Sequence, residues 1–284
     1  MYTVSRAGVL TGVPAATLRK WEQRYGVVAP ARTEGNYRLY DDEAIRRLSA
    51  MRDLVDAGWS ARDAARQVLD RTSVSPPRPQ AGATTGDLGA LTRCAVDFDA
   101  LGLHRLLDEE LAVGEPTDAV DGWLLPSLAK LGEAWARGEV SVAGEHFASA
   151  AVQRRLSRLY DEVPPAPVDA PRIVVGLPRG SRHELGVLAF AVVARSRGLD
   201  VTYLGSDLPV EAWVATTRAV VPRAAVVGVP LVEDLPAARE LAGALAPLTQ
   251  VLLGGAYQDR VEGVEPLGHR PGAAAADLAL RLHG

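Results

Sequence analysis

Residues Arg172 to Gly186 read RIVVGLPRGSRHELG, and this stretch decides the fold predicted for the chain. Its apolar run, Ile173 to Val175, is typical of a buried strand in a parallel sheet. From Glu184 onward, apolar residues recur with the spacing of a helix. We therefore expect His183 in a loop at the carboxyl edge of an open α/β sheet, which is where such sheets bind ligands. An imidazole there could bind a transition metal, or it could be a loop histidine without a role.

The alternation of strands and helices continues to the end of the chain. Further strands are predicted at Val201–Leu204, Val226–Val229 and Val251–Leu253, and a last helix at Ala273–Leu282. This order predicts a Rossmann-like α/β domain, a doubly wound parallel sheet, over residues 171–284. Gly254 and Gly255 would let a ligand approach the backbone closely. No GxGxxG follows the first strand, which argues against a dinucleotide site.

Composition limits the class of protein. A length of 284 residues with 48% hydrophobic residues indicates more than one domain. One cysteine, Cys94, excludes an intrachain disulfide and fits a reducing compartment. No signal peptide and no apolar run of about 18 residues is apparent, so we expect a cytoplasmic protein without a membrane partner. Residues 1–71 carry 12 Lys and Arg against 9 Asp and Glu, which favours a polyanion partner for that part alone.

Two short helices around a tight turn are predicted near the N-terminus. Ser5 would cap a helix from Arg6 to Thr11, Gly12 would end it, and a second helix would run from Pro14 to Tyr25. This is the pattern of a helix-turn-helix, whose second helix fits the DNA major groove. The second helix would project four polar or basic side chains, Thr17, Arg19, Lys20 and Arg24.

A hairpin, or wing, is predicted next, with its turn at Glu34–Asn36. Asp41 or Asp42 would cap the following helix, and Ser60 would cap another that runs to about Leu69. The alternative to DNA binding is a small helical interaction module with a solvated basic face. The wing would carry Arg32, Asn36, Tyr37 and Arg38 towards flanking phosphates.

The segments TLRKWEQRYG, AP-AR and GNYRLYDDEAIRRL resemble the winged-helix domain of the MerR superfamily. The resemblance covers nearly all of residues 1–70 and places the predicted winged-helix domain at residues 1–71. It implies a dimeric or higher-order regulator that binds double-stranded operator DNA through the residues just named.

Residues 72–86, TSVSPPRPQAGATTG, have the composition of a linker. Residues 87–163 then predict a central four-helix bundle, since apolar residues recur at helical spacing. Trp135 and the pair Glu145-His146 are separated by nine residues and would face one end of this bundle. They could cover a bulky, partly apolar ligand, or Trp135 could be core and Glu145-His146 a solvated first turn. The four segments are Asp87–Val96, Phe98–Val113, Pro116–Ala136 and Ala143–Asp161.

The sequence RHELG, with a later strand and loop and a Gly-Gly pair, resembles the cobalamin-binding domain of methionine synthase and the mutases. The resemblance implies that His183 binds cobalt in place of the lower axial base and that the displaced nucleotide tail enters the sheet. The spacing of Trp135 and Glu145-His146 resembles the helical cap of CarH/LitR-type photoreceptor repressors. The residues that would contact the cofactor are Trp135, Glu145, His146, His183, Gly186, Val229, Leu231, Gly254 and Gly255.

Three positions depart from the family pattern. Ser181 stands where an acid usually precedes the histidine, Val229 stands in the place of a serine, and Ala136 stands where some photoreceptors have a second histidine. The resemblance predicts a multidomain transcriptional repressor, not an enzyme, controlled by adenosylcobalamin and light through its oligomeric state, a dimer or tetramer. The departures favour an alternative, a MerR-type regulator whose C-terminal half is cobalamin-independent or senses another ligand. A cobalamin-dependent enzyme subunit is a third possibility, but the chain lacks room for the large barrel such reactions use.

Overall fold

The computed structural model describes residues 2–32, 37–56, 59–72, 86–112 and 114–284. The chain divides into two compact units, one of Met1–Ser75 with Leu131–His146 and one of Pro76–Lys130 with Phe147–Gly284. The predicted wing turn, including Asn36, and most of the predicted linker lie outside the described residues. Among the described residues, no helix combines the length and the apolar character needed to cross a membrane.

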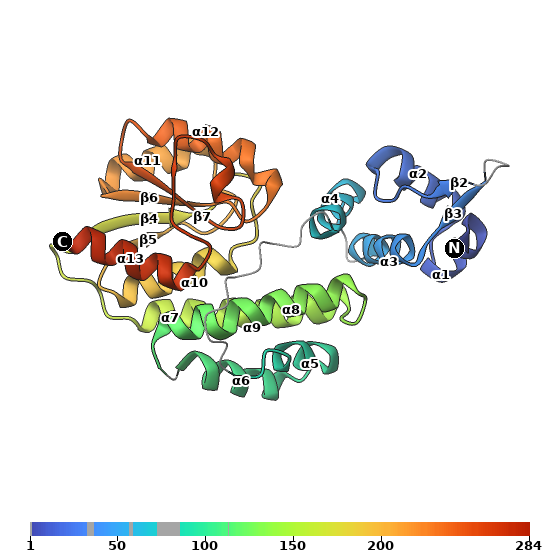
Figure 1. Ribbon diagram of the computed structural model, residues 1–284, viewed down its shortest axis with the longest axis horizontal. Helices are drawn as coiled ribbons and strands as arrows, with labels where there is room; N and C mark the ends of the chain where they lie inside the picture. Colours follow the sequence, from blue (N-terminus) through green and yellow to red (C-terminus); the bar gives the residue numbers. More distant parts are fainter. Residues whose placement is uncertain (1, 33–36, 57–58, 73–85, 113) are drawn as a thin grey trace. The chain divides into compact units, whose positions relative to one another are not determined.

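The N-terminal domain is a helix-turn-helix with a small antiparallel sheet in the order β1-β3-β2 (Figure 1). Gly12 and Gly26 adopt left-handed backbone conformations that end the two helices, as predicted. Leu18 and Trp21 are buried beneath the second helix. The elements are β1 (Tyr2–Thr3), α1 (Val4–Thr11), α2 (Ala15–Tyr25), β2 (Ala31–Arg32), β3 (Arg38–Tyr40), α3 (Asp42–Asp56) and α4 (Ala61–Thr72).

The N-terminal caps of these helices differ from the prediction at α1 and settle the choice between two residues at α3. Thr3, not Ser5, caps α1, because its hydroxyl accepts the Arg6 N–H at 3.4 Å and the helix begins at Val4. The carboxylate of Asp41 accepts the Ala44 N–H at 2.7 Å, so Asp41 is a cap of α3. Ser60 accepts the Asp63 N–H at 3.2 Å at the start of α4, as predicted.

The four predicted helical segments of the bundle are present, but the third is irregular. A π-helical stretch, η1, joins a short first turn to the long part of that helix. Phe98 has a left-handed φ of 52° and ends the first helix, so the second begins at Ala100 rather than at Phe98. The elements are α5 (Ala90–Asp97), α6 (Ala100–Ala112), α7 (Pro116–Asp118), η1 (Ala119–Leu124), α8 (Leu125–Ala136) and α9 (Val142–Glu162).

Asp121, in η1, joins this bundle to the C-terminal domain. Its buried carboxylate accepts the backbone N–H groups of Gly272 and Ala273, each at 2.8 Å, at the start of the last helix, α13 (Pro271–His283). The Arg270 guanidinium lies 3.5 Å from the same carboxylate. A side chain from the bundle therefore supplies the N-terminal cap that α13 lacks in its own sequence.

The C-terminal domain is a parallel five-stranded sheet in the order β5-β4-β6-β7-β8. Helices α10 and α13 cover one face and α11 and α12 cover the other (Figure 1). The doubly wound prediction is confirmed, but β8 was not predicted, because it has only two residues and no apolar run. The other elements are β4 (Arg172–Gly176), α10 (Leu185–Ser196), β5 (Asp200–Tyr203), α11 (Val210–Val220), β6 (Ala224–Gly228), α12 (Leu235–Leu245), β7 (Gln250–Gly254) and β8 (Glu265–Pro266).

Candidate functional site

The second helix of the helix-turn-helix presents a basic face. Thr17, Lys20 and Arg24 are spaced at i, i+3 and i+7 and therefore lie on one side of α2. Lys20 and Arg24 are exposed, as is the neighbouring Arg19, while Thr17 is half-buried. This is the arrangement in which a helix offers cations to a phosphate backbone and shorter side chains to base edges.

The wing residues divide into two kinds. Arg32 and Tyr37 are exposed, and Tyr37 keeps 75% of its surface accessible. Arg38 instead donates a hydrogen bond from Nε to the Glu22 carboxylate of α2 at 2.7 Å, and both side chains are less than a fifth exposed. This contact raises the pKa of Arg38. Arg38 therefore ties the wing strand to α2, a structural contact that the sequence had not indicated.

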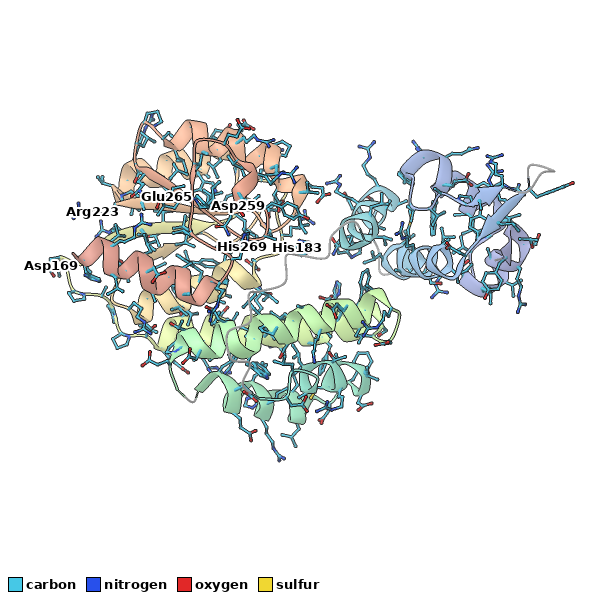
Figure 2. All side chains as sticks on the ribbon, viewed as in Figure 1. Asp169, His183, Arg223, Asp259, Glu265 and His269 are labelled. Atoms are coloured by element: carbon cyan, nitrogen blue, oxygen red, sulfur yellow. The ribbon has the colours of Figure 1, made fainter. Side chains whose placement is uncertain are left out.

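His183 lies in the loop that joins β4 to α10 and is exposed. Figure 2 shows it at the end of the sheet opposite Arg223, which precedes β6, so it lies at the carboxyl ends of the strands. The strand order reverses between β4 and β6, because β5 is on one side of β4 and β6 on the other. Open α/β sheets bind ligands at such a switch point, and the loop with His183 borders it.

Asp207, in the loop after β5, holds the histidine loop in place. Its carboxylate accepts the Gly180 N–H at 2.7 Å, and its own N–H donates to the Ser181 carbonyl at 2.9 Å. The Arg182 guanidinium lies 3.4 Å from the same carboxylate. Asp207 has a left-handed φ of 58°, which carries a small strain cost for a residue other than glycine. The two residues that precede His183, Ser181 and Arg182, are thus held in place by contacts with Asp207.

Glu184, directly after His183, contacts two other elements. The Tyr203 hydroxyl of β5 donates to its Oε2 at 3.1 Å, and the Gln153 amide of α9 donates to its Oε1. Burial, followed by the Glu184 charge, raises the pKa of Tyr203. The histidine loop is thus attached on its other side to the long bundle helix.

Ser181 is buried and points away from solvent. Its hydroxyl lies near the Asp234 carboxylate and lowers the pKa of that group, although burial, the larger effect, raises it. Among the described residues the hydroxyl makes no hydrogen bond of ordinary geometry. The Ser181 side chain therefore faces the Asp234 carboxylate in the interior and not the solvent-exposed side of the loop.

The predicted glycine positions do not behave alike. A Cβ atom added at Gly186 or at Gly254 would meet nothing within 4 Å, so both glycines border open space. A Cβ added at Gly255 would lie 2.7 Å from the Val229 carbonyl oxygen, and Gly255 has a left-handed φ of 99°. Gly255 is therefore required by its own chain, because the Val229 backbone lies where a side chain would be placed.

Val229 and Leu231 follow β6. The Val229 side chain is fully buried in the core between the sheet and helices α11 and α12, so it does not offer a surface to a ligand. The half-buried Leu231 donates its N–H to the Asp234 carboxylate at 2.9 Å. Of the two residues predicted to contact the cofactor in this loop, Val229 is thus a core residue and Leu231 is partly exposed.

Trp135 and the pair Glu145-His146 belong to the other compact unit. Trp135 ends α8 and is 7% exposed. Glu145 lies in the first turn of α9, where its carboxylate is 3.0 Å from Nδ1 of the half-exposed His146. The large ring and the acid-imidazole pair are thus present at the ends of consecutive helices, as predicted.

The side chains available as metal ligands limit the kind of metal centre that could bind at the sheet. Among the described residues, no group of three His, Cys, Asp or Glu side chains lies close enough to hold a metal ion. A single exposed imidazole fits only a metal whose other ligands come from its own cofactor, such as a corrin ring. His183 together with the open space at Gly186 and Gly254 fits such a group.

Comparisons with known proteins match a helix-turn-helix family to the N-terminal domain and a B12-binding family to the helical bundle. Residues 2–71 match the MerR HTH family regulatory protein model, and residues 88–160 match the B12 binding domain model. The repressor CarA of Myxococcus xanthus is 37% identical over 72% of this chain and 67% of its own length. The repressor CarH of the same organism is 33% identical over 74% of this chain and 72% of its own length.

The fold is also found in a solved structure. The monomethylamine corrinoid protein of Methanosarcina barkeri superposes with a TM-score of 0.56, covering 67% of this chain and 95% of that one, at 18% identity. The fold and sites define a helix-turn-helix regulator of the MerR class joined to a B12-binding module. Within that class, the chain belongs to the family of HTH-type transcriptional repressors that includes CarA and CarH.

Proposed function

We propose that this protein is a transcriptional repressor that binds operator DNA in the cytoplasm and responds to adenosylcobalamin, and through it to light. The observation that carries the proposal is an exposed His183 at the switch point of the sheet, on a loop fixed by Asp207. Family membership supports the DNA-binding and B12-binding parts. The adenosyl form and the light response follow from the resemblance to CarH/LitR-type photoreceptor repressors, and the site residues are argued from the geometry described above.

In this proposal His183 binds the cobalt, and Gly186 and Gly254 leave room for the nucleotide tail. When bound, the cofactor would supply a cobalt–carbon bond that light can break. Trp135, Glu145 and His146 would contact the adenosyl group, the indole with its apolar face and the pair with its polar atoms. Cofactor binding would stabilise the state of the protein that binds it better, and this is how the ligand would control assembly.

On the DNA side, Lys20, Arg24 and Arg32 would contact phosphates, with Arg19, Thr17, Asn36 and Tyr37 beside them. Arg38 would hold the wing in place through Glu22. We propose that the active form is a dimer or tetramer, since several linked DNA-binding domains grip an operator more tightly than one. Loss of the adenosyl group in light would then weaken the assembly and release the DNA.

Visible absorbance tests this function directly. Protein loaded with adenosylcobalamin in the dark should retain the corrin absorbance after desalting, and the His183→Ala variant should lose it or show the spectrum of cobalt without imidazole. His283→Ala, at an exposed position in the last helix, is the matched control and should behave as the parent. Retention of an identical spectrum by His183→Ala would reject the assignment of the axial ligand.

The buried Val229 and Ser181 favour a second candidate, a regulator whose C-terminal half takes no cobalamin. The same experiment separates the two candidates. A chain that binds duplex DNA but leaves desalting without corrin absorbance, in the dark and after illumination alike, would support the second.

A further inference from the structure

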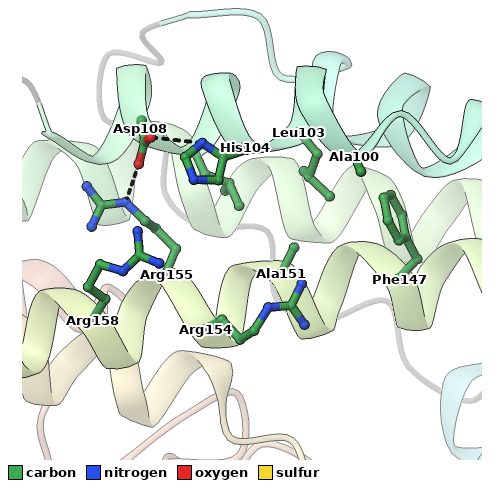
Figure 3. A pocket seen from close by; sticks show the side chains of 10 residues that line it. Ala100, Leu103, His104, Asp108, Phe147, Ala151, Arg154, Arg155 and Arg158 are labelled. Atoms are coloured by element: carbon green, nitrogen blue, oxygen red, sulfur yellow. Dashed lines mark ion pairs between the residues drawn. The ribbon is translucent and has the colours of Figure 1, made fainter.

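A cavity of about 140 Å³ opens between helices α6 and α9 of the bundle (Figure 3). Its walls include the apolar side chains of Leu103, Leu107 and Ala151, with Phe147 at one end. Small-molecule sites usually measure about 300–1,000 Å³, so this one is too small for most ligands. An apolar cavity of about 150 Å³ accepts a single benzene ring. The cavity therefore has the size for one aromatic side chain.

The rim of the cavity is cationic and partly unpaired. Arg155 lies 2.8 Å from Asp108, and His104 lies 3.0 Å from the same carboxylate (Figure 3). Arg154 and Arg158 are exposed, and within the described chain neither makes a hydrogen bond or an ion pair. Two guanidinium groups beside an apolar cavity favour an aromatic anchor that is accompanied by carboxylates.

The chain itself carries such an anchor next to the cavity. Phe98 is 50% exposed, lies between Asp97 and Asp99 in the sequence, and is held in a left-handed conformation. Its ring centre is 5.6 Å from that of Phe147, which lines the cavity. Asp99 caps α6 through the Gly102 N–H at 2.9 Å, so Asp97 is the carboxylate left for another partner.

Asp97 is not explained by the stability of its own helix. It is the last residue of α5, where a negative charge is opposed by the helix dipole. No ion pair of its side chain is found among the described residues. Phe98 and Asp97 are therefore both exposed beside the α6–α9 cavity. The cavity is apolar, which suits the ring, and its rim carries arginines, which suit the carboxylate.

We propose that this face binds a second copy of the chain. The Phe98 ring of each copy enters the α6–α9 cavity of the other, and Asp97 of each faces Arg154 and Arg158 of the other. A face that carries both halves of a contact is self-complementary and closes under a two-fold axis, so it forms a dimer and not a filament. From Phe147 to Arg158 the groove extends about 16 Å along α9, enough for a ring and its neighbouring carboxylate. The inference deepens the oligomer of the proposed function by naming its surface.

Charge reversal tests the contact in the full-length chain by sedimentation velocity over a range of concentrations. Arg154→Glu with Arg158→Glu should raise the dissociation constant of self-association about tenfold or more, because close charge pairs at interfaces contribute strongly. Asp97→Arg alone should have the same effect. The three changes together should bring the constant back to within about threefold of the parent, since opposite charges face each other again. Arg218→Glu, at an exposed position on α11, is the control and should leave association unchanged.

Phe98→Ala should weaken association as well, but Phe98 also contacts Phe147 in its own chain. A thermal melt of each variant shows whether the chain still folds, and the exposed charge variants keep the test decisive if Phe98→Ala does not. Association that is indifferent to the charge reversals, a triple variant as weak as its parts, or a chain that stays monomeric at every concentration would overturn the inference.

The outcomes also separate this surface from the cofactor. Sedimentation is measured with and without adenosylcobalamin, and corrin absorbance is recorded for every variant. If the charge variants keep the absorbance of the parent and associate as it does, the surface is wrong and the cofactor site stands. If association follows the charges but no corrin is retained, the surface stands and the proposed cofactor does not.

Discussion

Lys20 and His183 are both exposed side chains at candidate sites, but they are held there by different means. The helix with Lys20 is delimited by Gly12 and Gly26 and is seated by Leu18 and Trp21, all close in sequence. The loop with His183 is held by Asp207 and, through Glu184, by Gln153, residues 27 and 31 positions from their partners. Local sequence therefore positions the DNA-reading helix, whereas the topology of the sheet positions the histidine.

The largest effect is expected from the glycine pair in the C-terminal domain. Gly255→Ala should lower the free energy of unfolding by about 3 kcal/mol or more, because the new Cβ would strike the Val229 backbone and the left-handed φ would be strained. Gly254→Ala should change it by less than about 1 kcal/mol, since its Cβ meets open space. Urea unfolding followed by circular dichroism compares the two.

Cofactor loading should reverse the ranking of the two glycines. The methyl group of Gly254→Ala would project into the space proposed for the nucleotide tail, so this stable variant should retain less cobalamin than the parent. Equal stability losses at both positions, or full cobalamin retention by Gly254→Ala, would contradict the different roles given to them.

The next effect is on DNA binding. Replacing Lys20 and Arg24 with alanine should reduce the slope of log K against log salt by about 2, because each phosphate contact adds about 0.9. Stability should stay within about 0.5 kcal/mol, as these side chains are exposed. Fluorescence anisotropy with a random-sequence duplex measures the slope. Arg218→Ala with Arg223→Ala, two exposed arginines of the C-terminal domain, should leave the slope unchanged; an equal loss there would refute a localised DNA face.

A smaller effect is expected from the contact between α2 and the wing. Glu22→Gln removes the charge partner of the half-buried Arg38 and should lower the melting temperature of the N-terminal domain by a few degrees. Asp56→Asn is the control, because its partner Arg52 is 3.7 Å away and Asp56 is largely exposed. If both variants melted alike, the Glu22–Arg38 pair would have no structural role.

The smallest effect depends on pH. Burial raises the pKa of Asp234 above its ordinary value of 3.8. The folded state therefore holds this proton more tightly than the unfolded chain, and the resulting stability is present below pH 3.8 and lost as the pH rises through the raised value. Asp234→Asn can still accept the Leu231 N–H but carries no titratable group. Its free energy of unfolding relative to that of the parent should therefore increase as the pH rises through the raised pKa of Asp234. Urea unfolding from pH 3 to pH 7 measures it, with Asp118→Asn as an exposed control; a constant difference would contradict the shift.

Much of the fold was predictable because its signals are local. The helix-turn-helix and the four parallel strands β4 to β7 were expected from glycine positions and apolar runs. Strand β8 was not, because Glu265 and Pro266 carry no apolar pattern and pair only through the neighbouring Leu252 and Leu253. The cap at Thr3 was missed because Ser5 is an equally suitable residue type two positions later.

The candidate sites were predictable as residue types but not as contacts. Resemblance to known families indicated His183, Gly186 and Gly254, and their role in binding a cofactor stays a prediction. Nothing local indicated that Gly255 would be needed for the Val229 backbone, or that Ser181 would turn towards Asp234. These contacts depend on which loops the sheet brings together, and a Gly-Ser-Asp turn after a strand was the single hint at Asp207.

The π-helical stretch Ala119–Leu124 holds one residue more per turn than a regular helix, and Asp121 sits inside it. Removing one residue from this stretch would restore a regular helix and leave the faces of the flanking segments nearly where they are, because the wider turn is what absorbs the extra residue. A deletion that keeps Asp121 should therefore be tolerated better at α8 than at α13, whose first N–H groups depend on where that carboxylate lies. In this helix the extra residue serves the position of one side chain and not the packing of the helix that follows.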